Sequence, residues 1–240
     1  MDRYIIAIGG GDLRQKETLK IDGAIASLAK KRAGEKRAYA LFIGTASHDS
    51  MPYYNTFHKT YTGELGLKTD CALTVYGEMD YDKIKGKFEK ADMIYVGGGD
   101  TLYMIEKWRE SGIYDLIIDA YNRGVIISGL SAGGICWFSD MFTDSEMVDK
   151  SGAYSFAKGM GIVKGCACPH YNERKTDLIS CENTLNNLPI FAIENNSAIV
   201  LRNELLVGSL TCGGNAFILN NENGTVSENI IKSMDLSEFF

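Results

Sequence analysis

The sequence predicts an α/β fold, a doubly wound and mostly parallel sheet with an antiparallel C-terminal edge. Short apolar runs alternate with longer helical patterns through the first half of the chain. Runs such as Ile-Ile-Ala-Ile at 5–8 are apolar on both faces, as strands buried in a parallel sheet must be. Glycine is frequent, at 26 of 240 residues, whereas proline occurs 3 times. Such usage indicates tight strand-to-helix turns rather than flexible linkers.

The elements expected in the first half form a βαβ series. The strands are predicted at Tyr4–Ile8, Ala38–Ile43, Ala72–Tyr76, Met93–Val96 and Val125–Ser128. The helices between them are predicted at Arg14–Lys31, Tyr53–Glu64, Asp80–Lys90 and Thr101–Asn122. Because consecutive parallel strands need crossover helices, this order predicts a doubly wound sheet.

The last third of the sequence predicts short strands joined by hairpin turns. The strands are expected at Phe191–Ile193, Ser197–Leu201, Leu205–Gly208 and Ala216–Leu219, with turns at 202–204 and 221–224. Hairpins add antiparallel strands, so we expect them to finish the edge of the same sheet. No repeat or linker divides the chain, and we predict a single domain over residues 1–240.

Charge and composition exclude several classes of function. The net charge is −6, which argues against a nucleic-acid or anionic-membrane partner. No apolar run approaches the ~20 residues of a membrane span, and the N-terminal run is too short for a signal peptide. Six scattered cysteines are typical of reduced thiols, so we expect a cytoplasmic protein.

A Gly-x-Ser-x-Gly motif is the strongest chemical signal. Ser131 lies in Gly129-Leu130-Ser131-Ala132-Gly133, between a predicted buried strand and a predicted helix. A nucleophile elbow needs this context, because only small neighbours fit the sharp turn that exposes the hydroxyl. The alternative is that Ser131 only caps the following helix.

A nucleophilic serine needs a base, and the chain has three histidines. His58 falls in a helical pattern, whereas His170 ends an alternating stretch and is the favoured base; His48 follows the second strand and is the reserve. Glu194 follows an apolar run and is the candidate orienting carboxylate. The order Ser131, His170, Glu194 excludes an ordinary α/β-hydrolase, whose acid precedes its histidine.

A second glycine cluster, Gly97–Gly99, follows a predicted strand. Neither this cluster nor Gly9–Gly11 has the spacing of a dinucleotide fingerprint or a P-loop, so we expect no cofactor. Because glycine lets the main chain approach a ligand, the N–H groups of Gly97–Gly99 are candidate donors to an oxyanion. The alternative is a simple turn in which Asp100 caps the next helix.

Four of these motifs resemble the peptidase E (aspartyl dipeptidase) family, of which cyanophycinases are relatives. They are Gly-Gly-Gly-Asp-Thr at 97–101, Gly-Leu-Ser-Ala-Gly at 129–133, Cys-Pro-His at 168–170 and Ile-Glu-Asn at 193–195. The similarity runs from Gly9 to about Gly214. It implies a flavodoxin-like sandwich related to class I glutamine amidotransferases, with serine in place of their nucleophilic cysteine.

The resemblance also implies an activity, a serine-type dipeptidase or exopeptidase that works through an acyl-enzyme. Ser131 would be the nucleophile, His170 the base and Glu194 its partner. The oxyanion hole would consist of the N–H groups of Gly98 or Gly99 and of Ala132. Peptidase E cleaves dipeptides with N-terminal aspartate and has an arginine after its histidine; Arg174 is the nearest match and the candidate substrate-binding residue. The expected partner is a small peptide, with a homodimer left open.

Two other functions stay open at this point. In a strand, Cys166, Cys168 and His170 would share one face and could bind zinc, although the Cys-x-Cys spacing is tighter than usual. The chain could also be a ligand-binding protein without turnover, because geometry and not residue identity makes a base effective.

Overall fold

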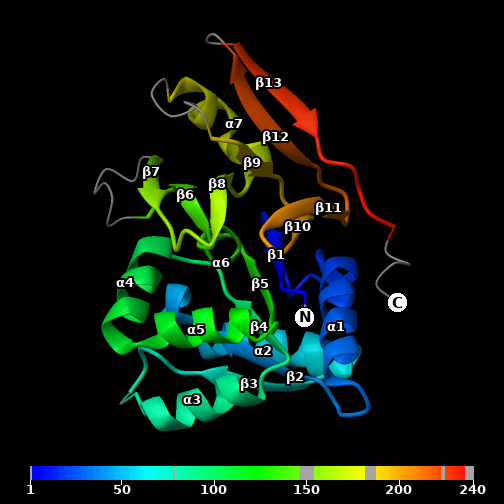
Figure 1. The fold of residues 1–240 in the computed structure, drawn as a ribbon, viewed down its shortest axis with the longest axis vertical. Coiled ribbons are helices and arrows are strands. Elements are labelled where there is room, and N and C mark those ends of the chain that lie inside the picture. The colour runs from blue at the N-terminus through cyan, green and yellow to red at the C-terminus, as the bar shows by residue number, and fades with distance from the viewer. Residues whose placement is uncertain (1, 78, 146–153, 182–187, 223–224, 236–240) are drawn as a thin grey trace.

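The computed structural model describes residues 2–77, 79–145, 154–181, 188–222 and 225–235, and within them it contains two sheets (Figure 1). The larger sheet has seven strands in the order β11-β10-β1-β5-β4-β2-β3, and the smaller has six in the order β13-β12-β9-β8-β6-β7. From β1 to β3 the neighbours in the larger sheet are parallel, and β10 and β11 add an antiparallel edge. The predicted α/β class is therefore confirmed.

The strands of the larger sheet are β1 (Tyr4–Ile8), β2 (Tyr39–Ile43), β3 (Lys68–Ala72), β4 (Met93–Val96), β5 (Ile126–Leu130), β10 (Ser197–Arg202) and β11 (Leu205–Thr211). Those of the smaller sheet are β6 (Phe138–Thr143), β7 (Ser155–Lys158), β8 (Val163–Cys168), β9 (Ile190–Ile193), β12 (Ala216–Glu222) and β13 (Thr225–Ile230). The α-helices are α1 (Leu19–Ala33), α2 (Met51–His58), α3 (Tyr81–Lys90), α4 (Thr101–Ser111), α5 (Ile113–Asn122), α6 (Ala132–Ile135) and α7 (Tyr171–Ser180), and a π-helix, η2 (Lys59–Glu64), continues α2.

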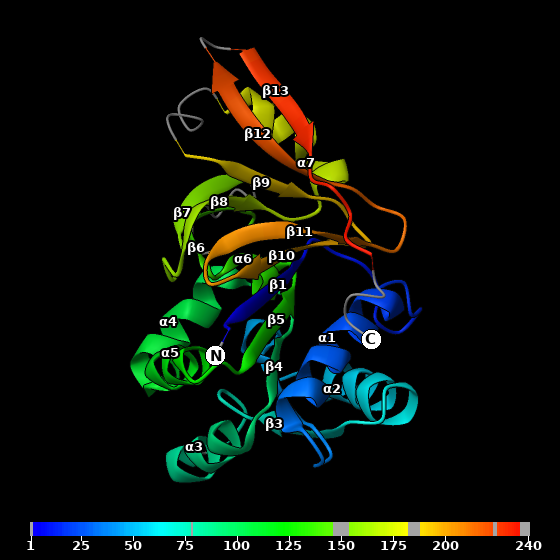
Figure 2. The ribbon, with the colours of Figure 1, turned by 45° about the vertical axis from the view of Figure 1, so that its right-hand side comes forward.

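Helices cover both faces of the larger sheet (Figure 2). Along β2, Leu41 and Ile43 pack into one buried cluster with α3, α4 and α5, whereas Ala40 and Phe42 pack into a second cluster with α1 and α2. This alternation is the reason for the apolar strand sequences, since both faces of each strand are buried.

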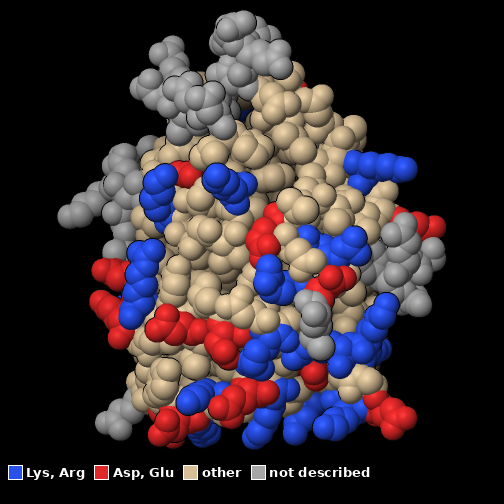
Figure 3. Space-filling model, viewed as in Figure 1, with Lys and Arg blue, Asp and Glu red and all other residues tan. Residues whose placement is uncertain are grey.

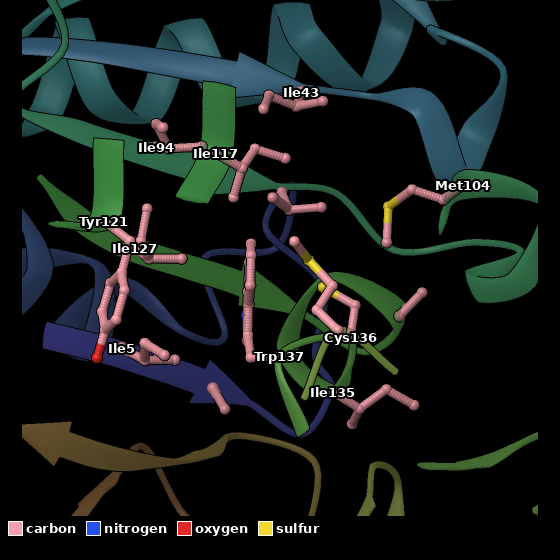
Figure 4. Packing of buried hydrophobic residues seen from close by; sticks show 14 of the residues in the cluster. Ile5, Ile43, Ile94, Met104, Ile117, Tyr121, Ile127, Ile135, Cys136 and Trp137 are labelled. Carbon is pink, nitrogen blue, oxygen red and sulfur yellow. The ribbon is translucent and has the colours of Figure 1, made fainter. Parts of the chain in front are cut away.

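The first cluster also joins the two sheets. Trp137 is fully buried, and its ring lies 6.3 Å from that of Trp108 on α4. Figure 4 shows the Trp137 ring between Ile5 and Ile127 of the larger sheet and Cys136. Burial of one large aromatic side chain contributes about 2–3 kcal/mol. The segment that follows Ser131 is thus anchored in the core.

Two expectations about elements in the first half of the chain were wrong in detail. The third strand is Lys68–Ala72 rather than Ala72–Tyr76, because the Asp49 carboxylate accepts the N–H groups of Thr74 (2.6 Å), Val75 (2.5 Å) and Tyr76 (3.0 Å) and holds them in a loop. The helix expected at Thr101–Asn122 is two helices, separated by Gly112 at φ 75°. Glycine adopts that conformation at little cost, which ends α4 there.

The C-terminal strands are also divided differently from the expectation. β10 and β11 extend the larger sheet, but β9 and β12 belong to the smaller one, together with β6, β7 and β13, which the sequence patterns missed. β9 pairs in parallel with β8 and antiparallel with β12. Local patterns predict that a segment is extended, whereas long-range pairing decides which sheet it joins.

Acidic and basic side chains are interspersed over the helical half of the face in Figure 3. This mixture is consistent with the modest net charge of −6. Among the described residues, no helix has the length and apolar character needed to cross a membrane.

Candidate active site

Ser131 occupies the sharp turn between β5 and α6. Its backbone has φ 53° and ψ −114°, a conformation that residues other than glycine rarely adopt. The Ser131 N–H donates to the Ile8 carbonyl oxygen at 2.9 Å and ties the turn to the end of β1. The predicted strand-to-helix turn is therefore present, although the helix after it has only four residues.

The glycines around Ser131 are required by close backbone contacts. A Cβ atom on Gly129 would lie 2.2 Å from the Gly133 oxygen, and one on Gly133 would lie 2.2 Å from the Val96 oxygen. Real Cβ atoms do not approach so closely, so these positions exclude any side chain. The Gly-x-Ser-x-Gly spacing thus reflects the packing of α6 against β4 and β5.

His170 follows β8 and reaches Ser131 from the other sheet. Its Nε2 atom lies 2.8 Å from Ser131 Oγ, within hydrogen-bonding distance. Its backbone has φ 50°, and its N–H donates to the Gly9 oxygen at 3.0 Å. The structure brings together the two residues that the sequence favoured as nucleophile and base.

The other side of the His170 ring contacts Asn195 rather than Glu194. Nδ1 lies 2.6 Å from Asn195 Oδ1. The Glu194 carboxylate instead accepts from the backbone N–H of Asn215 at 2.8 Å and from its side-chain amide at 3.2 Å. β9 ends at Ile193, and the turn that follows it directs the Asn195 side chain toward His170 and the Glu194 side chain toward Asn215. The structure thus does not show the contact between Glu194 and the His170 ring that the sequence predicts.

The side chain of Asn195 is held by α7. Its Nδ2 atom donates to Glu173 Oε1 at 2.5 Å, and its backbone N–H donates to Asn172 Oδ1 at 2.9 Å. Ser131, His170, Asn195 and Glu173 therefore form one continuous hydrogen-bonded series.

Gly10 lies directly beside the contact between His170 and Asn195. A Cβ atom on Gly10 would lie 2.0 Å from Asn195 Oδ1 and 2.4 Å from His170 Nδ1. Its carbonyl oxygen accepts the N–H of Asn196 at 2.9 Å. The sequence patterns indicate no role for Gly9–Gly11 and do not single out Asn195. The three successive glycines after a strand were the available signal of a close approach.

Burial lowers the pKa of His170 below its usual value, and the charge of Arg174 lowers it further. The hydrogen bond to Asn195 Oδ1 and the charges of Glu173 and Asp144 oppose this shift. A lowered pKa keeps the imidazole neutral at pH 7, and only the neutral ring can accept a proton from serine.

The Gly97–Gly99 loop lies against the nucleophile. A Cβ atom on Gly98 would lie 3.4 Å from Ser131 Cβ, and the Gly98 N–H donates to the Tyr53 hydroxyl at 3.3 Å. A Cβ atom on Gly99 would lie 2.1 Å from the Ala46 oxygen, and its φ is 140°. Asp100 also caps α4, since its Oδ1 atom accepts the Tyr103 N–H at 3.0 Å. The loop is therefore both a helix cap and a wall of the site.

A cavity of about 490 Å³ opens over Ser131. Its lining residues are Ala46, His48, Gly99, Asp100, Ser131, Asp144, Ser145, His170 and Arg174. His48, the reserve base, lies in this wall with its ring 4.4 Å from that of Tyr103. His58 is exposed, and its Nδ1 atom lies 2.6 Å from Thr69 Oγ1 outside this lining.

Arg174 is buried in the cavity wall, with 8% of its side chain exposed. One of its terminal nitrogens lies 3.2 Å from Asp144 Oδ1, and its guanidinium lies 4.8 Å from the centre of the Tyr154 ring. Its Nε atom is buried without a hydrogen-bond partner. Arg174 therefore contributes a positive charge to the wall of the cavity, and one of its donors is unpaired.

The geometry does not support the zinc alternative. Cys166 and Cys168 are buried in an apolar cluster with residues such as Phe142 and Tyr171. Burial raises the pKa of both thiols, that of Cys168 to about 12. No group of three His, Cys, Asp or Glu side chains among the described residues is arranged to hold a metal ion.

Comparisons with known proteins show what the chain is similar to. The model of peptidase family S51 matches residues 5–207. The uncharacterized peptidase YgaJ of Bacillus subtilis (strain 168) is 32% identical over 177 residues, which cover 72% of this chain and 70% of YgaJ. Peptidase E of Salmonella newport (strain SL254) is 36% identical over 66 residues, or 27% of this chain and 29% of that protein.

Two solved structures share the fold. A peptidase from an acI-B1 Actinobacterium has a TM-score of 0.68 and 17% identity, covering 98% of this chain and 96% of its own. A putative peptidase E from Listeria monocytogenes EGD-e has a TM-score of 0.64 and 18% identity, covering 88% of this chain and 99% of its own. At this level of identity the likeness supports the fold.

Proposed function

Because the chain belongs to peptidase family S51, we propose that it is a serine-type dipeptidase or exopeptidase that cleaves small peptides through an acyl-enzyme on Ser131. The observation that carries this proposal is the 2.8 Å contact between Ser131 Oγ and His170 Nε2 at a strained elbow. The cavity of about 490 Å³ has a volume that suits a small ligand such as a dipeptide.

The mechanism follows from these contacts. His170 Nε2 accepts the hydroxyl proton as Ser131 Oγ attacks the peptide carbonyl carbon. The same nitrogen then gives the proton to the departing amine, which leaves an ester on Ser131. A water molecule, deprotonated by His170, attacks the ester and releases the acid product. The proton then returns to Ser131 Oγ.

We assign the orienting role to Asn195 and not to Glu194. Its Oδ1 atom accepts from His170 Nδ1–H, which leaves Nε2 free to act as the base. We assign the oxyanion hole to the N–H groups of Gly99 and Ala132, because the Gly98 N–H is already directed at the Tyr53 hydroxyl.

Labelling with an organophosphonate tests this proposal against a ligand-binding protein without turnover. A serine paired with a base should form one covalent adduct, which intact-mass analysis would detect and peptide mapping would assign to residues around Ser131. Chelators should leave the labelling unchanged, since the proposed chemistry uses no metal. An adduct at another residue, or none with a folded protein, would contradict the proposal.

Substrate preference supplies a second test. We propose that Arg174 binds an acidic side chain, because it is buried in the cavity wall with an unpartnered Nε atom. An aspartate in the first position of a dipeptide would then replace Asp144 as the ion-pair partner of Arg174. Loss of a hydrogen bond to a charged group costs about 1.5–3 kcal/mol, or roughly 10- to 150-fold.

Arg174→Met should therefore remove most of the preference for Asp-X over Ala-X dipeptides and leave the cleavage of Ala-X nearly unchanged. The measurement is kcat/KM for both substrates with both proteins. Lys175→Met, at the next position of α7, is the matched control; Lys175 pairs with Glu228 at 2.6 Å. Equal kcat/KM for Asp-X and Ala-X in the unmodified enzyme would exclude aspartate specificity but not peptidase activity.

Three expectations from the sequence remain predictions. The six cysteines are all free thiols, which is consistent with a cytoplasmic location. A buried cluster containing residues of both sheets is consistent with a single domain over residues 1–240. A homodimer stays open and could be examined by sedimentation.

A further inference from the structure

The hydrogen-bonded series behind Ser131 contains an ambiguous member. The amide of Asn195 has one oxygen that only accepts and one nitrogen that only donates, and the two differ little in shape. Its Oδ1 atom lies 2.6 Å from His170 Nδ1, and its Nδ2 atom lies 2.5 Å from Glu173 Oε1. Rotation of the amide by 180° would exchange these two contacts.

The direction of this amide decides the tautomer of His170. With Oδ1 toward the ring, Nδ1 carries the proton and Nε2 is free to accept the proton of Ser131. With Nδ2 toward the ring, Nδ1 must be unprotonated, and the proton sits on Nε2. The second arrangement removes the base, and in the serine-protease triad an asparagine that imposes this tautomer lowers kcat about 10⁴-fold.

The Glu173 carboxylate removes the ambiguity, because an ionised carboxylate only accepts hydrogen bonds. It can contact Asn195 Nδ2 but not Oδ1, so Oδ1 must face His170. The backbone of Glu173 belongs to the same unit, since its N–H donates to the His170 oxygen at 2.8 Å. We infer that Glu173 is a positioning residue that fixes the tautomer of His170 through the amide of Asn195.

This inference rests on the proposed function and adds a residue that touches neither substrate nor nucleophile. Asn195 alone supplies no charge to the imidazolium that forms during catalysis. Glu173 supplies a negative charge one hydrogen bond further away. The other charged groups that face His170 are Arg174 and Asp144, and His48 and Asp100 line the same cavity.

The kinetic test compares three substitutions at Glu173. Glu173→Ala should lower kcat about tenfold with little change in KM. A tenfold loss is at the lower end of the range for losing a hydrogen bond to a charged group, because Glu173 is exposed to solvent. Glu173→Gln should retain most of kcat, since its oxygen can still accept from Asn195 Nδ2. Glu173→Lys should lower kcat further than Glu173→Ala, because a donor favours the reversed amide. Asp177→Ala, one turn along α7, is the control for loss of a carboxylate.

A double-mutant cycle separates this role from a structural one. In Asn195→Asp both side-chain oxygens accept, so the direction of the side chain no longer matters. Glu173→Ala should then cost less than twofold in that background. A role in stabilising the first turn of α7 would give the same loss in both backgrounds and would overturn the inference, as would an unchanged kcat for Glu173→Ala.

Long-range ¹H–¹⁵N correlation spectra give a direct measurement, and only three histidines contribute signals. His170 should be the Nδ1–H tautomer in the unmodified protein and shift toward Nε2–H in Glu173→Lys. The same tautomer in both proteins would contradict the inference. A phosphonate adduct on Ser131 keeps the two proposals distinct. If the adduct forms while Glu173 has no effect, only the inference fails; if no adduct forms, the proposed function fails.

Discussion

Replacement of Ser131 by alanine should lower kcat for peptide hydrolysis by about 10⁶-fold, the usual loss when the nucleophile of a serine hydrolase is removed. Without Oγ no ester can form, and His170 Nε2 loses the proton donor that lies 2.8 Å away. Residual hydrolysis would come from substrate binding and from the proposed oxyanion hole.

The fold should tolerate this change. Ser131 is half-buried and its backbone contacts, including the N–H donated to Ile8, do not involve its side chain. The melting temperature should therefore stay within about 2–3 °C of the unmodified protein, which circular dichroism would measure. Ser111→Ala is a matched control, because the Ser111 hydroxyl donates only to carbonyls of its own helix. Full activity in Ser131→Ala would exclude the acyl-enzyme mechanism.

Replacement of Gly10 by alanine should lower kcat about 10³- to 10⁴-fold without removing any group that contacts the substrate. The added Cβ atom would lie 2.0 Å from Asn195 Oδ1 and 2.4 Å from His170 Nδ1, so the two side chains must separate. Loss of the correct tautomer in an equivalent triad has an effect of this size. The expected result depends on Asn195 as the orienter, since the added atom would meet the side chains of Asn195 and His170.

Gly63→Ala is the control for the glycine substitution, because a Cβ atom at Gly63 would meet no atom within 4 Å. Activity should be normalised to the folded fraction from circular dichroism. Phosphonate labelling of the folded Gly10→Ala protein should be slower than in the unmodified protein by a factor similar to the loss in kcat. Normal kcat in Gly10→Ala would exclude the proposed position of Asn195. A loss of activity in Glu194→Gln, with none in Asn195→Ala, would return the orienting role to Glu194.

The positions of Ser131 and His170 could be predicted because each depends on local sequence. Ser131 needs a buried strand before it and glycines around it, and both are visible in Gly129-Leu130-Ser131-Ala132-Gly133. His170 follows an alternating run whose residues form strand β8 in the structure. Functional side chains in α/β proteins gather at the carboxyl ends of the parallel strands, so a contact between Ser131 and His170 was a reasonable expectation.

Asn195 and Gly10 could not be predicted in the same way. The choice between Glu194 and Asn195 depends on where β9 ends and on how the chain turns, and that turn is set by contacts with Asn215 and Asn172. The constraint on Gly10 comes from side chains 160 or more positions away in the sequence. Similarly, Arg174 was expected to face a substrate, and the structure adds Asp144 as its partner.

The sequence by itself determined the α/β class, most strands of the larger sheet and the elbow at Ser131, because periodicity and glycine spacing act within a few residues. Only the tertiary structure decided that β9 and β12 form part of a second sheet. It also decided that Asn195 and Glu173, rather than Glu194, complete the hydrogen-bonded series behind His170. Such contacts join side chains from distant segments, and a shift of one residue changes which side chains meet. Local sequence patterns do not specify a long-range register to within one residue.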